Sequence, residues 1–114
     1  MGWYGVDLDG TLAYYDGWKG ADHIGAPVPA MIERVKELLR KEQEVRIFTA
    51  RVGPQKSQQE RRMALVAIQG WCKKHLNIVL PVTATKDYAM IVLYDDRCVQ
   101  IIPNTGKRAD GEEW

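Results

Sequence analysis

Short apolar runs alternate with amphipathic stretches along this chain. The first run, residues 3–8, is apolar and rich in strand formers, which is typical of a buried strand. Similar short runs recur further along the chain, and the pattern predicts strands at 3–8, 45–49, 78–82, 91–95 and 99–102.

Two stretches between these runs have helical periodicity. The first carries apolar residues at helical spacing, namely Met31, Ile32, Val35, Leu38 and Leu39. The second begins near Ser57, whose spacing to Glu60 is that of a capping box, and runs to about His75, with Asn77 as its stop. Helices that alternate with strands predict an α/β, three-layer, Rossmann-like fold: a mainly parallel sheet with helices on both faces.

The remaining segments are connections. Residues 13–29 are rich in Gly and Pro, which predicts a loop or a small hairpin flap and leaves no room for a folded cap domain. We expect a single domain over residues 1–114, with a core at about 3–102 and a loose polar tail at 103–114.

Composition limits the classes of function. The 114 residues include 16 Lys and Arg against 15 Asp and Glu, and this balance excludes a uniformly basic, general nucleic-acid binder. The two cysteines, Cys72 and Cys98, are expected to be reduced thiols because they lack the spacing of a zinc site or a disulfide scaffold. No signal peptide or membrane span is apparent, so we expect a cytoplasmic protein without membrane partners.

Polar residues that can do chemistry stand at the ends of the expected strands. Asp7, Asp9, Gly10 and Thr11 follow the first strand, Thr49 ends the second, Asp95 and Asp96 end the fourth, and Lys86 precedes the fourth. The carboxyl ends of parallel strands meet at one edge of a sheet, which is where such folds place their sites. Clustered carboxylates repel one another unless a cation relieves them, and Mg²⁺ prefers oxygen ligands of this kind.

With these motifs in this order, the chain resembles the haloacid dehalogenase (HAD) superfamily, whose members are mostly magnesium-dependent phosphatases. The resemblance covers nearly all of residues 3–102. It rests on the first motif at residues 6–12, on Thr49 after residues 45–48, on Lys86, and on the Asp95-Asp96 pair after residues 91–94. Since no cap is present, the chain is most similar to capless members of the superfamily.

The resemblance implies a role for each of these residues. Asp7 would be the nucleophile that forms an aspartyl-phosphate, and Asp9 the acid and then the base. Thr49 would bind a phosphoryl oxygen, and Lys86 would offset the negative charge.

The resemblance also implies ligands and contacts. Mg²⁺ would be held by Asp7, Asp95 and the backbone carbonyl of Asp9, with Asp96 bound directly or through a water. Gly10, Ala50 and Arg51 are the expected substrate-binding residues.

An open site suits a nucleic-acid end or a phosphoprotein, or a small substrate enclosed by a second subunit of a homo-oligomer. Tyr14, Tyr15 and Trp18 on the 13–29 segment could stack on a base. The run at 94–97 resembles 5'(3')-deoxyribonucleotidases, and the capless architecture resembles polynucleotide 3'-phosphatase domains. A basic rim is expected beside the site, composed of Arg51, Lys56, Arg61 and Arg62. We therefore favour a nucleotide or a nucleic-acid terminal phosphate as the substrate.

Two other classes of function share parts of this pattern. A HAD-like domain could bind a metal or a partner without turnover, although every expected catalytic residue is present. A phospho-acceptor receiver domain also uses aspartates, a Thr and a Lys on a parallel sheet, but its residues come in a different order and no Asp ends the 45–49 strand.

Overall fold

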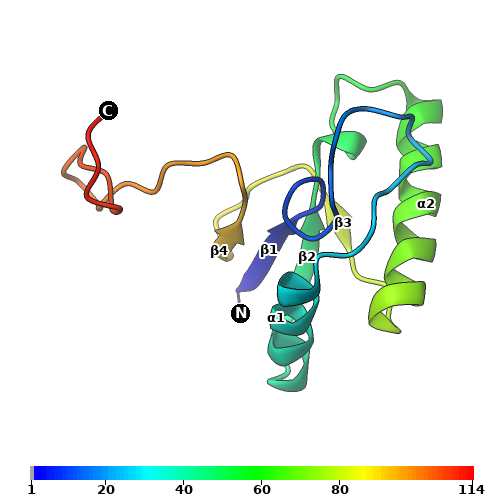
Figure 1. Cartoon of the computed structure of the whole chain (residues 1–114), viewed down its shortest axis with the longest axis horizontal. Coiled ribbons are helices and arrows are strands. Elements are labelled where there is room, and N and C mark those ends of the chain that lie inside the picture. The colour runs from blue at the N-terminus through cyan, green and yellow to red at the C-terminus, as the bar shows by residue number, and fades with distance from the viewer. Residues whose placement is uncertain (1) are drawn as a thin grey trace.

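The computed structural model describes residues 2–114 and has an α/β, Rossmann-like fold. Its sheet has four parallel strands in the order β3-β2-β1-β4 (Figure 1). In chain order the elements are β1 (Trp3–Asp7), α1 (Pro29–Arg40), β2 (Glu44–Phe48), the 3₁₀ turn η1 (Ala50–Val52), α2 (Gln58–Leu76), β3 (Val82–Thr83) and β4 (Met90–Tyr94). The predicted α/β, Rossmann-like fold class with a parallel sheet is confirmed.

The helix boundaries follow from local chemistry. Pro29 opens α1, where its missing N–H removes no intrahelical bond. The predicted capping box of α2 is present, because the Ser57 hydroxyl accepts from the Glu60 amide and the Glu60 carboxylate accepts from the Ser57 amide. Asn77 ends α2 in the left-handed conformation, with φ 63°. No helix in the described part of the chain is both long and apolar enough to cross a bilayer.

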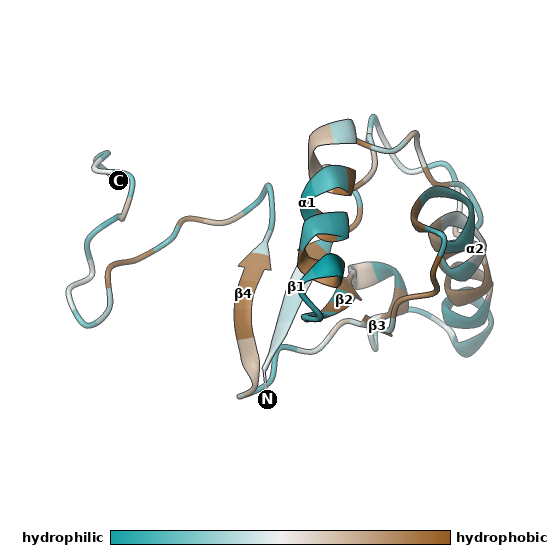
Figure 2. Cartoon of the chain, turned by 90° about the horizontal axis from the view of Figure 1, so that it is seen from below, coloured by the Kyte–Doolittle hydropathy of each residue, from teal (hydrophilic) through white to brown (hydrophobic). Residues whose placement is uncertain are grey.

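Both helices pack on the same face of the sheet, whereas the sequence predicted helices on both. Val6, Val45 and Ile47 point to this face and join α1 and α2 in one core. The connections from β1 to β2 and from β2 to β3 both move toward the same edge of the sheet. Right-handed crossovers in one direction place α1 and α2 on the same face. The return step to β4 is only residues 84–89, and these form no helix. Figure 2 shows α1 and α2 beside each other.

On the opposite face, the Trp3 ring is fully buried although no described helix covers it. A Cβ at Gly5 would lie 3.1 Å from the Trp3 ring, so the missing side chain lets the ring lie across the sheet. Arg46 covers the ring at 4.5 Å from its centroid, and the indole N–H donates to Asp87 at 2.8 Å. The short 84–89 connection is therefore anchored directly to the sheet.

Two predicted strands are wrong in detail. The strand expected at 78–82 is the two-residue β3, because residues 78–81 are the approach to it, with Leu80 buried in the core and Pro81 unable to donate to a ladder. Among the described residues, the strand expected at 99–102 does not join the sheet and makes one isolated bridge, Ile101 with Arg108. The tail expected to be loose folds back on itself there, with Ala109 N donating to Gln100 O at 2.8 Å.

The 13–29 segment is a small flap, as predicted. Ala13 bridges Pro27, and the Tyr14 amide donates to Ala26 O at 2.8 Å. The Trp71 indole of α2 donates to Gly25 O at 3.0 Å and anchors the flap to the body. The described residues contain no folded cap domain over the sheet edge.

Candidate functional site

A pocket of about 450 Å³ opens at the carboxyl ends of the strands. Most of the predicted site residues line it, together with members of the expected aromatic set and basic rim and two residues that the sequence did not single out for a role, Phe48 and Arg97. The lining residues are Asp7, Asp9, Tyr15, Trp18, Phe48, Thr49, Ala50, Arg51, Lys56, Asp95, Asp96 and Arg97. Acidic, basic and aromatic side chains thus share one concave surface at the edge where α/β folds bind ligands.

A tight turn follows β1 and sets the first motif in place. The amides of Leu12 and Ala13 donate to Leu8 O at 3.0 and 2.9 Å. Gly10 adopts φ 88°, and a Cβ at this position would lie 2.4 Å from Asp96 Oδ2. The sequence suggests Gly10 as a substrate-binding residue, but it does not line this pocket; its missing side chain instead admits the Asp96 carboxylate.

Three carboxylates converge at this turn. Asp7, Asp95 and Asp96 each offer an oxygen atom, and these atoms lie within 4.8 Å of one another. The Thr11 hydroxyl lies between two of them, 3.4 Å from Asp7 Oδ2 and 3.2 Å from Asp96 Oδ1. The sequence-based expectation that these aspartates from β1 and β4 meet is therefore confirmed.

Burial raises the pKa of the Asp7 carboxyl from 3.8 to about 7. A hydrogen bond with Asp96 and the negative charges of Asp95 and Asp96 add to the effect, while the Thr11 hydroxyl opposes it. Without a cation, Asp7 therefore holds a proton over much of the acidic pH range.

The donor set fits a hard divalent cation. All three groups are carboxylates, and two of the three residues are half-buried, so a cation would remove a repulsion that otherwise raises the pKa of Asp7. The Asp9 carboxylate lies outside this cluster, which leaves its backbone carbonyl as the ligand that the sequence suggested. These residues would hold Mg²⁺, which takes few protein carboxylates and keeps several waters.

The Asp9 carboxylate is bound by Arg51. Arg51 Nε lies 2.8 Å from Asp9 Oδ2, and Nη2 lies 2.9 Å from Oδ1, which makes a bidentate pair. The remaining guanidinium nitrogen, Nη1, donates to the flap carbonyls of Ala21 at 3.2 Å and Gly20 at 3.4 Å. The side chain of Arg51 is only 5% exposed, so it links the first motif to the flap rather than lying open to a ligand.

Thr49 lines the pocket from the end of β2. Its hydroxyl accepts from the Arg51 amide at 3.2 Å and so caps η1. Its own amide donates to Thr83 O at 2.9 Å, which fixes the end of β2 against β3. The hydroxyl hydrogen remains available for an oxygen in the pocket. Ala50 also lines the pocket.

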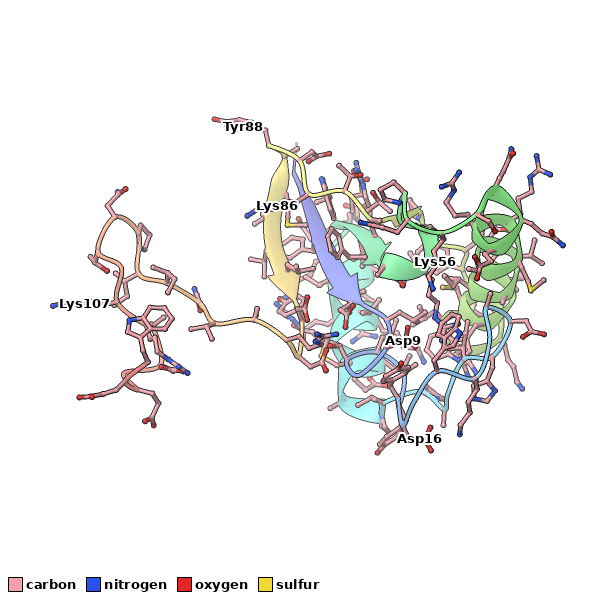
Figure 3. The ribbon with its side chains drawn as sticks, turned by 90° about the horizontal axis from the view of Figure 1, so that it is seen from above. Asp9, Asp16, Lys56, Lys86, Tyr88 and Lys107 are labelled. Atoms are coloured by element: carbon pink, nitrogen blue, oxygen red, sulfur yellow. The ribbon has the colours of Figure 1, made fainter. Side chains whose placement is uncertain are left out.

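The structure does not bring Lys86 into the pocket. Figure 3 shows Lys86 on the connection between β3 and β4, well away from Asp9, whereas Lys56 points toward the region of Asp9. Lys56 lines the pocket, and its ammonium lies 4.5 Å from the centroid of the Trp18 ring. The carbonyl of Lys56 accepts from Arg61 Nη1 at 2.9 Å, so α2 holds this loop.

Beyond the catalytic and metal-binding residues, the pocket contains Lys56, a member of the basic rim that the sequence predicted beside the site. Arg97 also lines the pocket, and its amide donates to Asp95 Oδ1 at 2.8 Å. Tyr15 and Trp18 project from the flap with about half of each residue exposed. Tyr14 is more exposed and does not line the pocket.

Comparisons with known proteins add evidence on the fold alone. No family model matches this chain, and no curated protein matches it. A solved structure of a conserved protein from Bacteroides thetaiotaomicron superposes with a TM-score of 0.54 at 18% identity, covering 89% of this chain and 80% of that one. What the fold and the site define is therefore a class: a Rossmann-like α/β protein with an acidic and basic pocket at the carboxyl edge of its sheet.

Proposed function

We propose that this chain is a Mg²⁺-dependent phosphomonoesterase of the capless HAD type. The observation that carries the proposal is the meeting of the three-aspartate cluster with a hydroxyl and with cationic side chains in one pocket. Carboxylates that hold a divalent cation, beside cations that neutralise a phosphoryl group, are the parts that phosphoryl transfer needs.

Asp7 is the nucleophile in this proposal. Its carboxylate oxygen attacks phosphorus, a bond forms between that oxygen and phosphorus, and the bond from phosphorus to the leaving alcohol breaks. Mg²⁺ held by Asp7, Asp95 and Asp96 would supply positive charge that keeps Asp7 ionised and balances the phosphate. Water then attacks phosphorus, which releases inorganic phosphate and regenerates the Asp7 carboxylate.

Asp9 donates a proton in the first step and accepts one in the second. Its pairing with Arg51 suits the second step, in which an ionised carboxylate accepts a proton from the attacking water. The first step requires a proton on Asp9 for the leaving alcohol. We expect substrate binding to loosen the Asp9–Arg51 pair, which would release Asp9 to take up that proton.

In this proposal Lys56 offsets the negative charge of the phosphoryl group, which is the role that the family resemblance implies for Lys86. Among the cationic residues that line the pocket, Arg51 is paired with Asp9, while Lys56 and Arg97 form no ion pair with another described residue. Thr49 and Lys56 would contact the phosphoryl oxygens from two sides. Lys56 also contacts Trp18, so binding of the phosphate and packing of the flap are linked through one side chain.

The substrate that fits best is a nucleotide or a nucleic-acid terminal phosphate. Tyr15 and Trp18 give the pocket an aromatic side at which a base or sugar can pack. Lys56 and Arg97 line the mouth through which a polyanionic chain would enter. The absence of a folded cap in the described residues leaves room for a strand end.

A non-catalytic metal- or partner-binding domain is the second candidate. The Asp9–Arg51 pair favours it, because a carboxylate locked to a buried guanidinium is not poised to donate a proton. The two candidates differ in turnover and not in metal binding.

Phosphate release separates them. The substrates are p-nitrophenyl phosphate and 3'- and 5'-phosphorylated nucleotides and oligonucleotides, each with Mg²⁺ and with EDTA. We expect Mg²⁺-dependent release that Asp7→Asn reduces at least about a thousandfold and that the matched surface variant Glu33→Gln leaves unchanged. Undiminished activity in Asp7→Asn would refute the nucleophile assignment, and no release from any substrate would favour the non-catalytic domain.

A further inference from the structure

One edge of the sheet is left open. The strand order places β4 at the end, so its outer edge has no strand neighbour among the described residues. Sheet edges are usually protected by a charge, a proline or a covering segment. β4 reads Met-Ile-Val-Leu-Tyr, with no charge and no proline, and Ile91 and Val92 are 51% and 39% exposed. This edge has the character of a surface that another strand covers.

The same chain carries a C-terminal segment that is detached from the sheet and the helices and that begins with an apolar stretch, residues 99–102. Residues 99–114, here called the arm, extend away from the sheet and the helices (Figures 1 and 2). Among the described residues, the hydrogen bonds and ion pairs of the arm join it only to itself. Val99, Ile101 and Ile102 are each about two-fifths exposed. Folding of the arm onto itself therefore leaves apolar surface uncovered on all three residues.

Residues 99–102 have the sequence of a strand but lack a sheet to join. Val-Gln-Ile-Ile is rich in β-branched residues and carries no charge. The turn that follows is preorganised by Asn104 and Gly106, both with positive φ, and the Ile102 amide donates to Lys107 O at 2.8 Å. The arm is thus already partly ordered before any partner binds, which lowers the entropy cost of docking.

The start of the arm points away from the chain's own β4. The amide of Arg97 donates to Asp95 Oδ1, and the Thr11 hydroxyl donates to Asp96 Oδ1, so contacts hold the two residues that directly follow β4. To pair with its own β4, the arm would have to turn back within residues 95–98, whereas the chain leads away from the sheet after β4 (Figures 1 and 2). The edge of a second copy requires no such change.

We propose that the chain forms a two-fold dimer by arm exchange, in which residues 99–102 of each copy add as a strand to the free edge of β4 in the other. Two apolar, uncharged surfaces meet, so no charge is buried without a partner. The contact is reciprocal and closes on itself, as a two-fold interface must. The backbone groups of β4 and the arm pair across it, as in β-strand addition.

Because the arm starts three residues after Asp96, docking would also steady the acidic cluster. The dimer does not depend on the phosphatase proposal, since it rests on the edge of β4 and on the arm and not on the pocket.

The first test is the mass of the full chain in solution, measured by sedimentation over a wide range of concentration. We expect a dimer, and we expect Ile101→Lys in the arm and Ile91→Lys on β4 each to give a monomer. Both side chains are exposed within one copy, so the fold should survive, which circular dichroism checks. Val66→Lys is the matched control, because Val66 is 69% exposed on α2 and far from the arm. A monomer at every concentration, or a dimer that both lysine variants leave intact, would overturn the proposal.

The second test asks which copy the arm contacts. In an equal mixture of isotope-labelled and unlabelled chains, isotope-filtered NMR detects contacts between copies. We expect such contacts between the methyl groups of residues 99–102 and those of Ile91 and Val92. Contacts found only within one copy would mean that the arm folds onto its own sheet, and the exchange would be refuted.

Discussion

The guanidinium of Arg51 binds the carboxylate of Asp9 through two hydrogen bonds, of 2.8 and 2.9 Å. The pair ties the turn after β1 to η1, and the flap carbonyls of Gly20 and Ala21 complete the shell around the guanidinium. One side chain therefore holds together the proposed acid–base residue and the flap, whose Tyr15 and Trp18 line the pocket.

We predict that Arg51→Ala lowers the free energy of unfolding by about 3 kcal/mol, because it leaves the Asp9 charge partly buried without a partner. Urea denaturation measures the loss. The double variant with Asp9→Asn should lose less than the sum of the two single variants, because the pair acts as a unit.

Arg108→Ala is the matched control for this loss. Arg108 also forms a bidentate pair, with Asp110, but this pair lies at the surface of the arm. Its loss should cost much less, since exposed ion pairs contribute little to stability. Equal losses for the two arginine variants would show that Arg51 does not organise the site.

We predict that Lys56→Ala lowers kcat/KM about a hundredfold, while Lys86→Ala has a much smaller effect. Lys56 lines the pocket and Lys86 does not, so only the first should stabilise phosphoryl charge. Lys56→Arg should recover part of the activity, because it restores the charge. If Lys86→Ala is the more damaging change, the sequence-based assignment is right and the one from the pocket is wrong.

The metal-free protein should become less stable as the pH rises from about 4 to about 7. The pKa of Asp7 is raised in the folded state, so as the pH rises the unfolded chain ionises at this carboxyl before the folded chain does. Ionisation lowers the free energy of the unfolded chain, and the free energy of unfolding falls. Asp7→Asn stays neutral, and we predict a higher Tm than wild type in EDTA at about pH 8, with a smaller difference at about pH 5. A Tm difference that is the same at both pH values would contradict the raised pKa.

We predict that Gly10→Ala destabilises the fold and weakens Mg²⁺ binding. The new methyl group would combine a positive φ with a contact of 2.4 Å to Asp96, so the carboxylate must move out of the cluster. Gly17→Ala separates the backbone strain from the contact with Asp96. Gly17 also has a positive φ, but a methyl group added there would have no neighbour within 4 Å. The Gly17 variant should cost only the backbone strain, about 1–3 kcal/mol. Calorimetric titration with Mg²⁺ should show unchanged affinity in Gly17→Ala; reduced affinity there would contradict the assignment.

Much of the arrangement follows from local sequence chemistry. The apolar run ending in Asp7, the capping box at Ser57 and the stop at Asn77 each predict their element directly. Because β1 and β4 are parallel neighbours, their carboxyl ends had to bring Asp7 and Asp96 to one place. The acidic cluster was therefore predictable once the sheet was.

Other features depend on the path of the chain in space. Strand propensity at 99–102 says nothing about whether a sheet edge is within reach, and here the turn at Asp96 leads the segment away. The position of Lys86 in the sequence places it shortly before β4. It does not say at which edge of the sheet the connection between β3 and β4 leaves this side chain. The bond between Arg51 and Asp9 joins residues 42 positions apart, and no local pattern signals it.

The central claim is that Asp7 takes the phosphoryl group. The most direct measurement is an acid quench during turnover with Mg²⁺, followed by mass spectrometry of the peptide that contains Asp7. We predict that wild type gains the mass of one phosphoryl group at Asp7, that hydroxylamine removes it as expected for an acyl phosphate, and that Asp7→Asn shows none. Turnover with the phosphoryl group on another residue, or with Asp7 unmodified throughout, would contradict the account.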